Sequence, residues 1–162
     1  MLRSLIGILI LFFISHSGFS NPEIITYNFE EFKKNILDSH ENEDLMIINF
    51  WATWCGPCVR ELPHFEEINQ EYKSKQVRVV LVSLDFENQY EKKLIPFIQR
   101  KNLQSELIWL NDTKYNDWID QVTPQWSGAI PATVLMRGGK VLDFYEKELS
   151  VEDLQKAINQ LL

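Results

Sequence analysis

A Cys-Gly-Pro-Cys motif holds the only two cysteines of this chain, Cys55 and Cys58, and it closely follows a continuous apolar run, Leu45–Trp51. An apolar run of strand length without polar alternation is typical of a strand buried on both faces of its sheet. Behind the motif, residues 59–72 carry apolar side chains at helical spacing. A Cys-x-x-Cys pair in such a position is a redox motif when the neighbouring elements form β-α-β units. The rest of the chain therefore decides how the pair is interpreted.

Strand and helix patterns alternate along the rest of the chain. Apolar or alternating runs bounded by turn residues predict strands, and apolar residues spaced three and four positions apart predict helices. Pro63 and Pro96 fall inside two of these helices, where proline kinks or splits the backbone. The predicted strands cover residues 23–27, 45–51, 77–85, 106–110, 132–137 and 140–145, and the predicted helices cover residues 29–39, 59–72, 87–101, 114–121 and the segment after Ser150.

Capping and turn residues support these boundaries. Asn28 with Glu31, and Ser150 with Asp153, form capping-box patterns at two helix starts. Two glycines at 138–139 join two strand patterns and predict a two-residue hairpin. This order of elements predicts an α/β fold, with a mixed central sheet and helices on both of its faces.

Length and composition fit one globular domain. The chain has 162 residues, of which 45% are hydrophobic and 24% charged, and its formal net charge is -7. A nucleic-acid surface needs a basic stripe, so this acidic balance argues against a nucleic-acid partner.

Residues 1–20 have the pattern of a secretory signal peptide. A basic start with Arg3 precedes an unbroken apolar run at 5–14, and small residues up to Ser20 offer cleavage sites. The apolar run is shorter than the ~20 residues that span a bilayer. We expect a cleaved signal peptide at 1–20, a domain at 21–162 and a periplasmic location. An uncleaved membrane anchor is the alternative.

Two segments of the chain resemble the thioredoxin superfamily. These are residues 49–63, which contain Trp-Cys-Gly-Pro-Cys, and residues 128–133, which contain Ile-Pro at the start of a strand. More narrowly, the chain is similar to the exported TlpA/ResA-like thiol:disulfide oxidoreductases from about residue 22 onward. The resemblance implies a thioredoxin-like fold with a helix-strand insertion at 87–121. It also implies a cis peptide bond before Pro131 and a substrate contact through the backbone of Ile130.

The two cysteines are assigned different roles. Cys55 lies at a strand-to-helix junction, where N–H groups and the helix dipole favour its thiolate, so it is the predicted nucleophile. Cys58, one turn along the helix, is placed to resolve the mixed disulfide. Trp54, Gly56 and Pro57, which surround Cys55, join Ile130 and Pro131 as candidate substrate contacts.

Two other uses of the cysteines fit the sequence less well. A purely structural disulfide across so short a loop contributes only about 2 kcal/mol, which is a weak use of a disulfide. A zinc site would need further ligands, and His64 is poorly spaced to share ligation with the cysteines. His64 is instead expected to be an exposed helix residue.

Resolution by Cys58 needs a proton acceptor. Thioredoxin has a buried aspartate where Asn49 stands here, and an asparagine cannot act as a base. Glu61, three residues after Cys58, is the candidate replacement, and the TlpA/ResA-like group is similar in having an acidic residue at this place. The alternative is a solvated carboxylate near the helix start that only interacts with the helix dipole.

The tryptophans are assigned to surface or packing roles. Trp54 is expected to be partly exposed and Trp51 to pack inside the domain. Trp109, Trp118 and Trp126 are candidates for lining a groove near Pro131, although packing is the favoured role for each.

These residues predict a periplasmic reductase of protein disulfides that needs no cofactor and no metal. Its Gly-Pro dipeptide resembles the reducing type of the superfamily, so a membrane-embedded partner must supply its electrons. We expect a monomer, and both cytochrome c maturation and general thiol repair are open as its role. The alternative from another class is a binding module that carries a metal ion or docks an apo-cytochrome without turnover. A thiol peroxidase fits less well, because its site needs a Thr and an Arg around a lone Cys.

Overall fold

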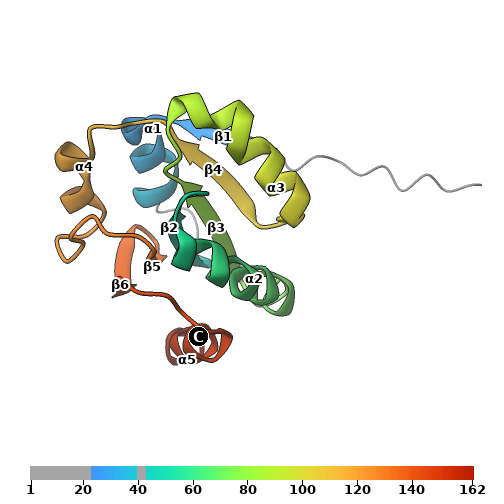
Figure 1. Cartoon of the computed structure of the whole chain (residues 1–162). Coiled ribbons are helices and arrows are strands. Elements are labelled where there is room, and N and C mark those ends of the chain that lie inside the picture. Colours follow the sequence, from blue (N-terminus) through green and yellow to red (C-terminus); the bar gives the residue numbers. More distant parts are fainter. Residues whose placement is uncertain (1–22, 40–42) are drawn as a thin grey trace, which may run out of the picture.

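The computed structural model describes residues 23–39 and 43–162, in which six strands form one mixed sheet in the order β1-β4-β3-β2-β5-β6 (Figure 1). Parallel pairing joins β1 to β4, β4 to β3 and β3 to β2, whereas β5 is antiparallel to β2 and to β6. The predicted signal peptide at 1–20 lies outside the described residues. The strands are β1 (Ile24–Tyr27), β2 (Leu45–Trp51), β3 (Val77–Ser83), β4 (Glu106–Leu110), β5 (Ala132–Arg137) and β6 (Lys140–Tyr145).

The helices lie on both faces of the sheet, as the sequence predicts. They are α1 (Phe29–Phe32), which continues as the wider turn η1 (Lys33–Leu37), then α2 (Gly56–Glu71), the short turns η2 (Glu87–Gln89) and η3 (Tyr90–Leu94), α3 (Ile95–Lys101), α4 (Tyr115–Val122) and α5 (Val151–Leu161). None of the helices in the described ranges is both long and apolar enough to cross a membrane.

β2 is buried along its whole length and separates two apolar cores. Ile47 and Trp51 face the core that α2, α3 and α5 cover, whereas Ile48 and Phe50 face the core under α1 and α4. Successive strand residues point to opposite faces, so a strand buried on both sides reads as one apolar run. β2 thereby fixes the start of α2 in the middle of the sheet.

The structure differs from the prediction at the start of α2 and refines it at the two prolines inside helices, Pro63 and Pro96. α2 begins at Gly56 rather than at 59, because Pro57 in the first turn needs no N–H acceptor and has a helical φ. Proline at this position starts the helix instead of delaying it. α2 also continues through Pro63. Pro96 was predicted to bend or split its helix, but the backbone stays helical from η3 into α3: Leu94 and Ile95 both have helical φ and ψ angles, and α3 takes Pro96 into its first turn.

The predicted caps and hairpin are confirmed. Asn28 accepts the N–H of Glu31 at 2.9 Å while Glu31 accepts that of Asn28 at 3.0 Å, and Ser150 and Asp153 form the same reciprocal pair. Gly138 and Gly139 have φ angles of 55° and 73°, which a two-residue hairpin of this kind requires.

The helix-strand insertion is built into the sheet. β4 pairs in parallel with β3 on one side and with β1 on the other. The insertion that the resemblance implied therefore adds a strand inside the sheet, between β1 and β3. β2, the strand that leads to the cysteines, keeps its place between β3 and β5.

Candidate active site

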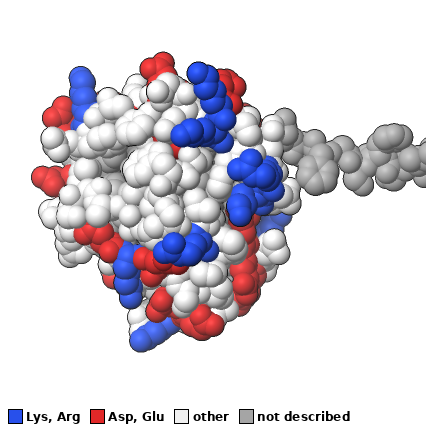
Figure 2. All heavy atoms as spheres, viewed as in Figure 1, with Lys and Arg blue, Asp and Glu red and all other residues white. Residues whose placement is uncertain are grey.

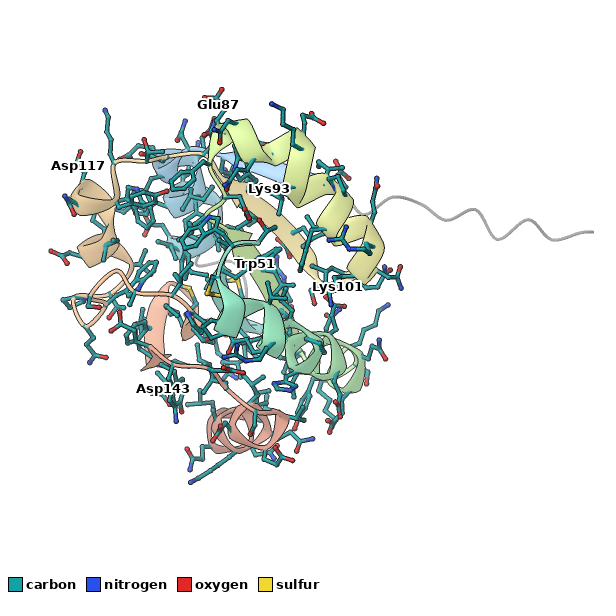
Figure 3. All side chains as sticks on the ribbon, in the orientation of Figure 1. Trp51, Glu87, Lys93, Lys101, Asp117 and Asp143 are labelled. Carbon is teal, nitrogen blue, oxygen red and sulfur yellow. A yellow bond between two sulfur atoms is a disulfide. The ribbon has the colours of Figure 1, made fainter. Side chains whose placement is uncertain are left out.

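Cys55 and Cys58 form a disulfide at the start of α2, visible as the yellow bond in Figure 3, with their Cα atoms 5.3 Å apart. Cys55 is the N-cap of α2, and its Sγ accepts the N–H of Cys58 at 3.3 Å. Cys55 is 6% exposed and Cys58 is fully buried. Free N–H groups and the positive end of the helix dipole favour an anion at an N-cap, so a reduced Cys55 lies where its thiolate is stabilised.

The loop before β5 lies against the disulfide. The peptide bond between Ile130 and Pro131 is cis, as the resemblance implied, and the carbonyl oxygen of Ile130 lies 3.7 Å from Cys55 Sγ. Ile130 is half-buried, whereas Gly56, the residue after Cys55, is exposed. A sulfur atom bonded to Cys55 would therefore lie beside the backbone of Ile130.

Glu61 is a buried carboxyl group. Its Oε1 accepts the side-chain N–H of Asn49 at 2.8 Å, and its Oε2 accepts the backbone N–H of Leu149 at 2.8 Å. Burial raises the pKa of Glu61 to about 7, and the hydrogen bonds from Leu149 and Asn49 act in the opposite direction. The alternative of a solvated carboxylate is wrong, since Glu61 lies on the buried face of α2 one turn after Cys58.

Asn49 has a second partner that explains its position. It lies opposite Thr133 in the ladder between β2 and β5, and its side-chain N–H also bonds the Thr133 hydroxyl at 3.1 Å. One amide group thus links the strand behind Pro131 to the carboxyl group on α2.

His64 is not the exposed residue that the sequence predicts. Its side chain is partly buried, and Nδ1 lies 2.8 Å from the carbonyl oxygen of Leu149. Leu149 thus uses its N–H for Glu61 and its C=O for His64. Within the described ranges, no group of three His, Cys, Asp or Glu side chains is arranged to hold a metal ion.

Asp85, a buried residue just after β3, is a site residue that was not predicted from the sequence. Its carboxylate accepts the backbone N–H of Thr53 at 3.0 Å, the Thr53 hydroxyl and, at 2.9 Å, the Ser83 hydroxyl. The carbonyl oxygen of Asp85 also accepts the indole N–H of Trp109 at 2.8 Å. Asp85 therefore holds the loop between β2 and Cys55. An aspartate at the end of a buried strand was the signal available in the sequence.

Replacing Asp85 by alanine is expected to lower the free energy of unfolding by about 3 kcal/mol, because the half-buried donors on Thr53 and the buried hydroxyl of Ser83 lose their acceptor. Urea denaturation of the oxidised protein measures this change. Asp85→Asn keeps one acceptor oxygen and is expected to lose about half as much. A loss below about 1 kcal/mol in Asp85→Ala would contradict the assigned role.

An aromatic groove adjoins the Ile130 backbone. Trp54 is 50% exposed, as predicted, and stacks on Phe86 with ring centroids 6.0 Å apart. Behind this pair lies a groove of about 290 Å³, lined chiefly by Trp54, Phe86, Trp118, Ile119, Trp126 and Ile130. Trp118 and Trp126 are buried in the core and show only part of their rings to the groove.

Trp51 and Trp109 belong to the opposite core. Trp51 packs on Phe97, and Trp109 stacks on Tyr90 with ring centroids 4.2 Å apart. Packing is therefore their role, as predicted. On the surface, the face of the molecule drawn in Figure 2 carries few charged side chains at its centre, over the start of α2 and the loop before β5.

Comparisons with known proteins agree with this architecture. Residues 23–99 match the thioredoxin family model. Thiol-disulfide oxidoreductase ResA of Geobacillus kaustophilus is 28% identical over 120 residues, which are 72% of this chain and 62% of that protein. ResA of Oceanobacillus iheyensis is 52% identical over 40 residues, which are 25% of this chain and 21% of that protein. The chain thus spans less than two thirds of the length of these curated relatives.

A solved structure has the same fold. The crystal structure of a DsbF homologue from Corynebacterium diphtheriae matches with a TM-score of 0.60 and 21% identity, and the match covers 74% of this chain and 73% of that chain. At this identity the likeness concerns the fold alone.

Proposed function

Because residues 23–99 match the thioredoxin family model and the curated relatives are thiol-disulfide oxidoreductases, we propose that the chain belongs to the thioredoxin superfamily and reduces disulfide bonds of other proteins by thiol-disulfide exchange. The observation that carries this proposal is the position of Cys55, whose sulfur caps α2 and lies 3.7 Å from the Ile130 carbonyl oxygen. A thiolate at that position is stabilised, and a substrate chain bonded to it has a backbone to contact.

The reaction has two exchange steps. The thiolate of reduced Cys55 attacks one sulfur of the substrate disulfide, the second substrate sulfur leaves as a thiolate, and a mixed disulfide forms. Cys58 then loses its proton and attacks Cys55 Sγ, which releases the first substrate sulfur. Two electrons pass to the substrate, and the protein returns to its Cys55–Cys58 disulfide.

Glu61 is the proposed proton acceptor for Cys58. The two residues lie one turn apart on the buried face of α2, and the pKa of Glu61 is raised by burial to about 7. A base with a pKa near the working pH accepts a proton effectively and returns it readily. Asn49 and Leu149 hold this carboxyl group in place.

The proposed setting is the periplasm. The basic and apolar pattern at 1–20 supports export, with an uncleaved anchor as the alternative form. Because that compartment is oxidising, a membrane-embedded donor would have to return electrons to Cys55 and Cys58. The proposed substrates are protein disulfides, reduced by a monomer without a metal or an organic cofactor, in cytochrome c maturation or in thiol repair.

Insulin reduction tests the proposed activity. The chain without residues 1–20 is expected to accelerate the precipitation of insulin by dithiothreitol, at catalytic concentration and at pH 7.5. Absence of acceleration would contradict the proposal. If the reduced protein instead retained one equivalent of metal ion and exchanged no thiols, the binding module would be the better description.

A further inference from the structure

The loop before Pro131 is held by a surface carboxylate that follows β6. Oε1 of Glu146 accepts the backbone N–H of Ser127 at 3.1 Å, the backbone N–H of Ala129 at 3.0 Å and the hydroxyl of Ser127. From the other side, the indole N–H of Trp126 donates to the carbonyl oxygen of Ala129 at 2.8 Å. The backbone of residues 127–129 is thus fixed by partners on both sides.

The sheet register brings Glu146 to this loop. Tyr145, the last residue of β6, lies opposite Thr133 in β5. Because the two strands are antiparallel, the residue after Tyr145 lies beside the segment that precedes β5. Glu146 itself is exposed, so its contacts with the loop are not a by-product of core packing.

Residues 127–129 would be poorly ordered without the hydrogen bonds to Glu146. Residues 127–129 are exposed, and Gly128 has a φ angle of 95°, a region that glycine enters freely but also leaves freely. A loop with this composition loses much conformational entropy when it is ordered. The bonds to Glu146 order it before any substrate arrives.

The loop that Glu146 holds leads directly to Ile130, whose backbone lies next to the sulfur of Cys55. The carbonyl oxygen of Ile130 lies 3.7 Å from Cys55 Sγ, so a polypeptide bonded to that sulfur lies beside the Ile130 backbone. The hydrogen bonds of Glu146 go to residues 127 and 129, and Glu146 takes no part in the cysteine, Glu61 and Asn49 contacts described above.

We propose that Glu146 is a positioning residue, which fixes the loop before Pro131 so that Ile130 is presented to a polypeptide substrate in one conformation. The inference rests on the proposed function. Ordering the loop in advance lowers the entropy lost on substrate binding, so the effect falls on binding of a peptide chain and not on the sulfur chemistry.

The test compares two disulfide substrates of the purified full chain. One is a peptide with a single intramolecular disulfide, for which dithiothreitol supplies the electrons and its uncatalysed rate is subtracted. The other is 5,5′-dithiobis(2-nitrobenzoic acid), which has no peptide backbone; because dithiothreitol reduces it directly, it is added to protein that has been reduced beforehand and freed of dithiothreitol. In Glu146→Ala we expect KM for the peptide to rise roughly tenfold, with kcat and the rate with the small disulfide changed less than about twofold. Hydrogen exchange of the Ser127 and Ala129 amides should become at least about tenfold faster.

Two further variants serve as controls. Glu146→Gln keeps an acceptor oxygen and is expected to restore KM to within about threefold of the wild type. Glu67→Ala removes an equally charged, exposed carboxylate from α2, and KM for the peptide is expected to stay unchanged.

Two results would overturn the inference while leaving the proposed function intact. These are an unchanged KM for the peptide in Glu146→Ala, and an equal loss of activity on both substrates, which would indicate general damage. A wild-type chain that reduces neither disulfide would overturn the proposed function, and the inference with it.

Discussion

Replacing Cys55 by serine is expected to lower the rate of insulin reduction by at least about a thousandfold, because the variant loses its nucleophile. A serine hydroxyl at the same N-cap stays protonated at neutral pH, and it cannot attack a disulfide sulfur. Since serine is also a good N-cap residue, α2 keeps its cap and the fold is expected to survive. The measurement is dithiothreitol-driven insulin reduction, with far-ultraviolet circular dichroism to check folding.

The matched variant is Cys58→Ser, which keeps the nucleophile and loses the resolving thiol. It is expected to accumulate a mixed disulfide on Cys55, detectable by mass spectrometry with a disulfide peptide and reversed by dithiothreitol. If Cys55→Ser formed the adduct and Cys58→Ser did not, the two roles would have to be exchanged. Adducts in neither variant would count against the exchange mechanism.

The free energy of unfolding is expected to fall as the pH rises from about 4.5 to about 7, because Glu61 is buried. The ordinary pKa of the carboxyl group is 4.5, and burial raises it to about 7 in the folded chain. Between these values the folded protein holds a proton that the unfolded chain releases. The stabilisation is therefore complete below about 4.5 and is lost by about 7, and it amounts to on the order of 3 kcal/mol.

Urea denaturation of the oxidised protein at both ends of this pH range measures the change. Glu61→Gln cannot titrate, so the difference between wild type and variant isolates this carboxyl group from the others. An identical pH dependence in the two proteins would show that Glu61 has no raised pKa.

The same variant tests the proposed role of Glu61 in the reaction. Resolution of the mixed disulfide by wild-type Cys58 is expected to accelerate as the pH rises through about 7, where Glu61 becomes a base. In Glu61→Gln this rise should disappear and the rate at pH 7.5 should fall about tenfold to a hundredfold. A fall without loss of the pH dependence would point to a packing defect.

Much of the fold could be predicted because its signals are local. β2, β4, β5 and β6 have the predicted bounds, since each is an apolar or alternating run between turn residues. The capping boxes and the Gly138-Gly139 hairpin depend on residues at most three positions apart. The position of the cysteine pair at the start of a helix followed from the same local patterns.

The contacts that position the site were not predictable, because they join distant parts of the chain. Hydrogen bonds join Glu61 to Leu149, Asp85 to Thr53, and Glu146 to the loop before Pro131. Local pattern could not place these partners, and it led to the wrong prediction that His64 is exposed. The burial of Glu61 did have a local signal, since it lies at helical spacing between Cys58 and the buried Phe65.

The place of β4 between β1 and β3 sets the order in which the sheet can be completed. β1 is the first strand described, but it is hydrogen-bonded to β4, with Ile24 opposite Leu107. Pairing between segments so far apart requires closure of a long loop, and such contacts form slowly. The first strand therefore docks only after the middle of the chain is available.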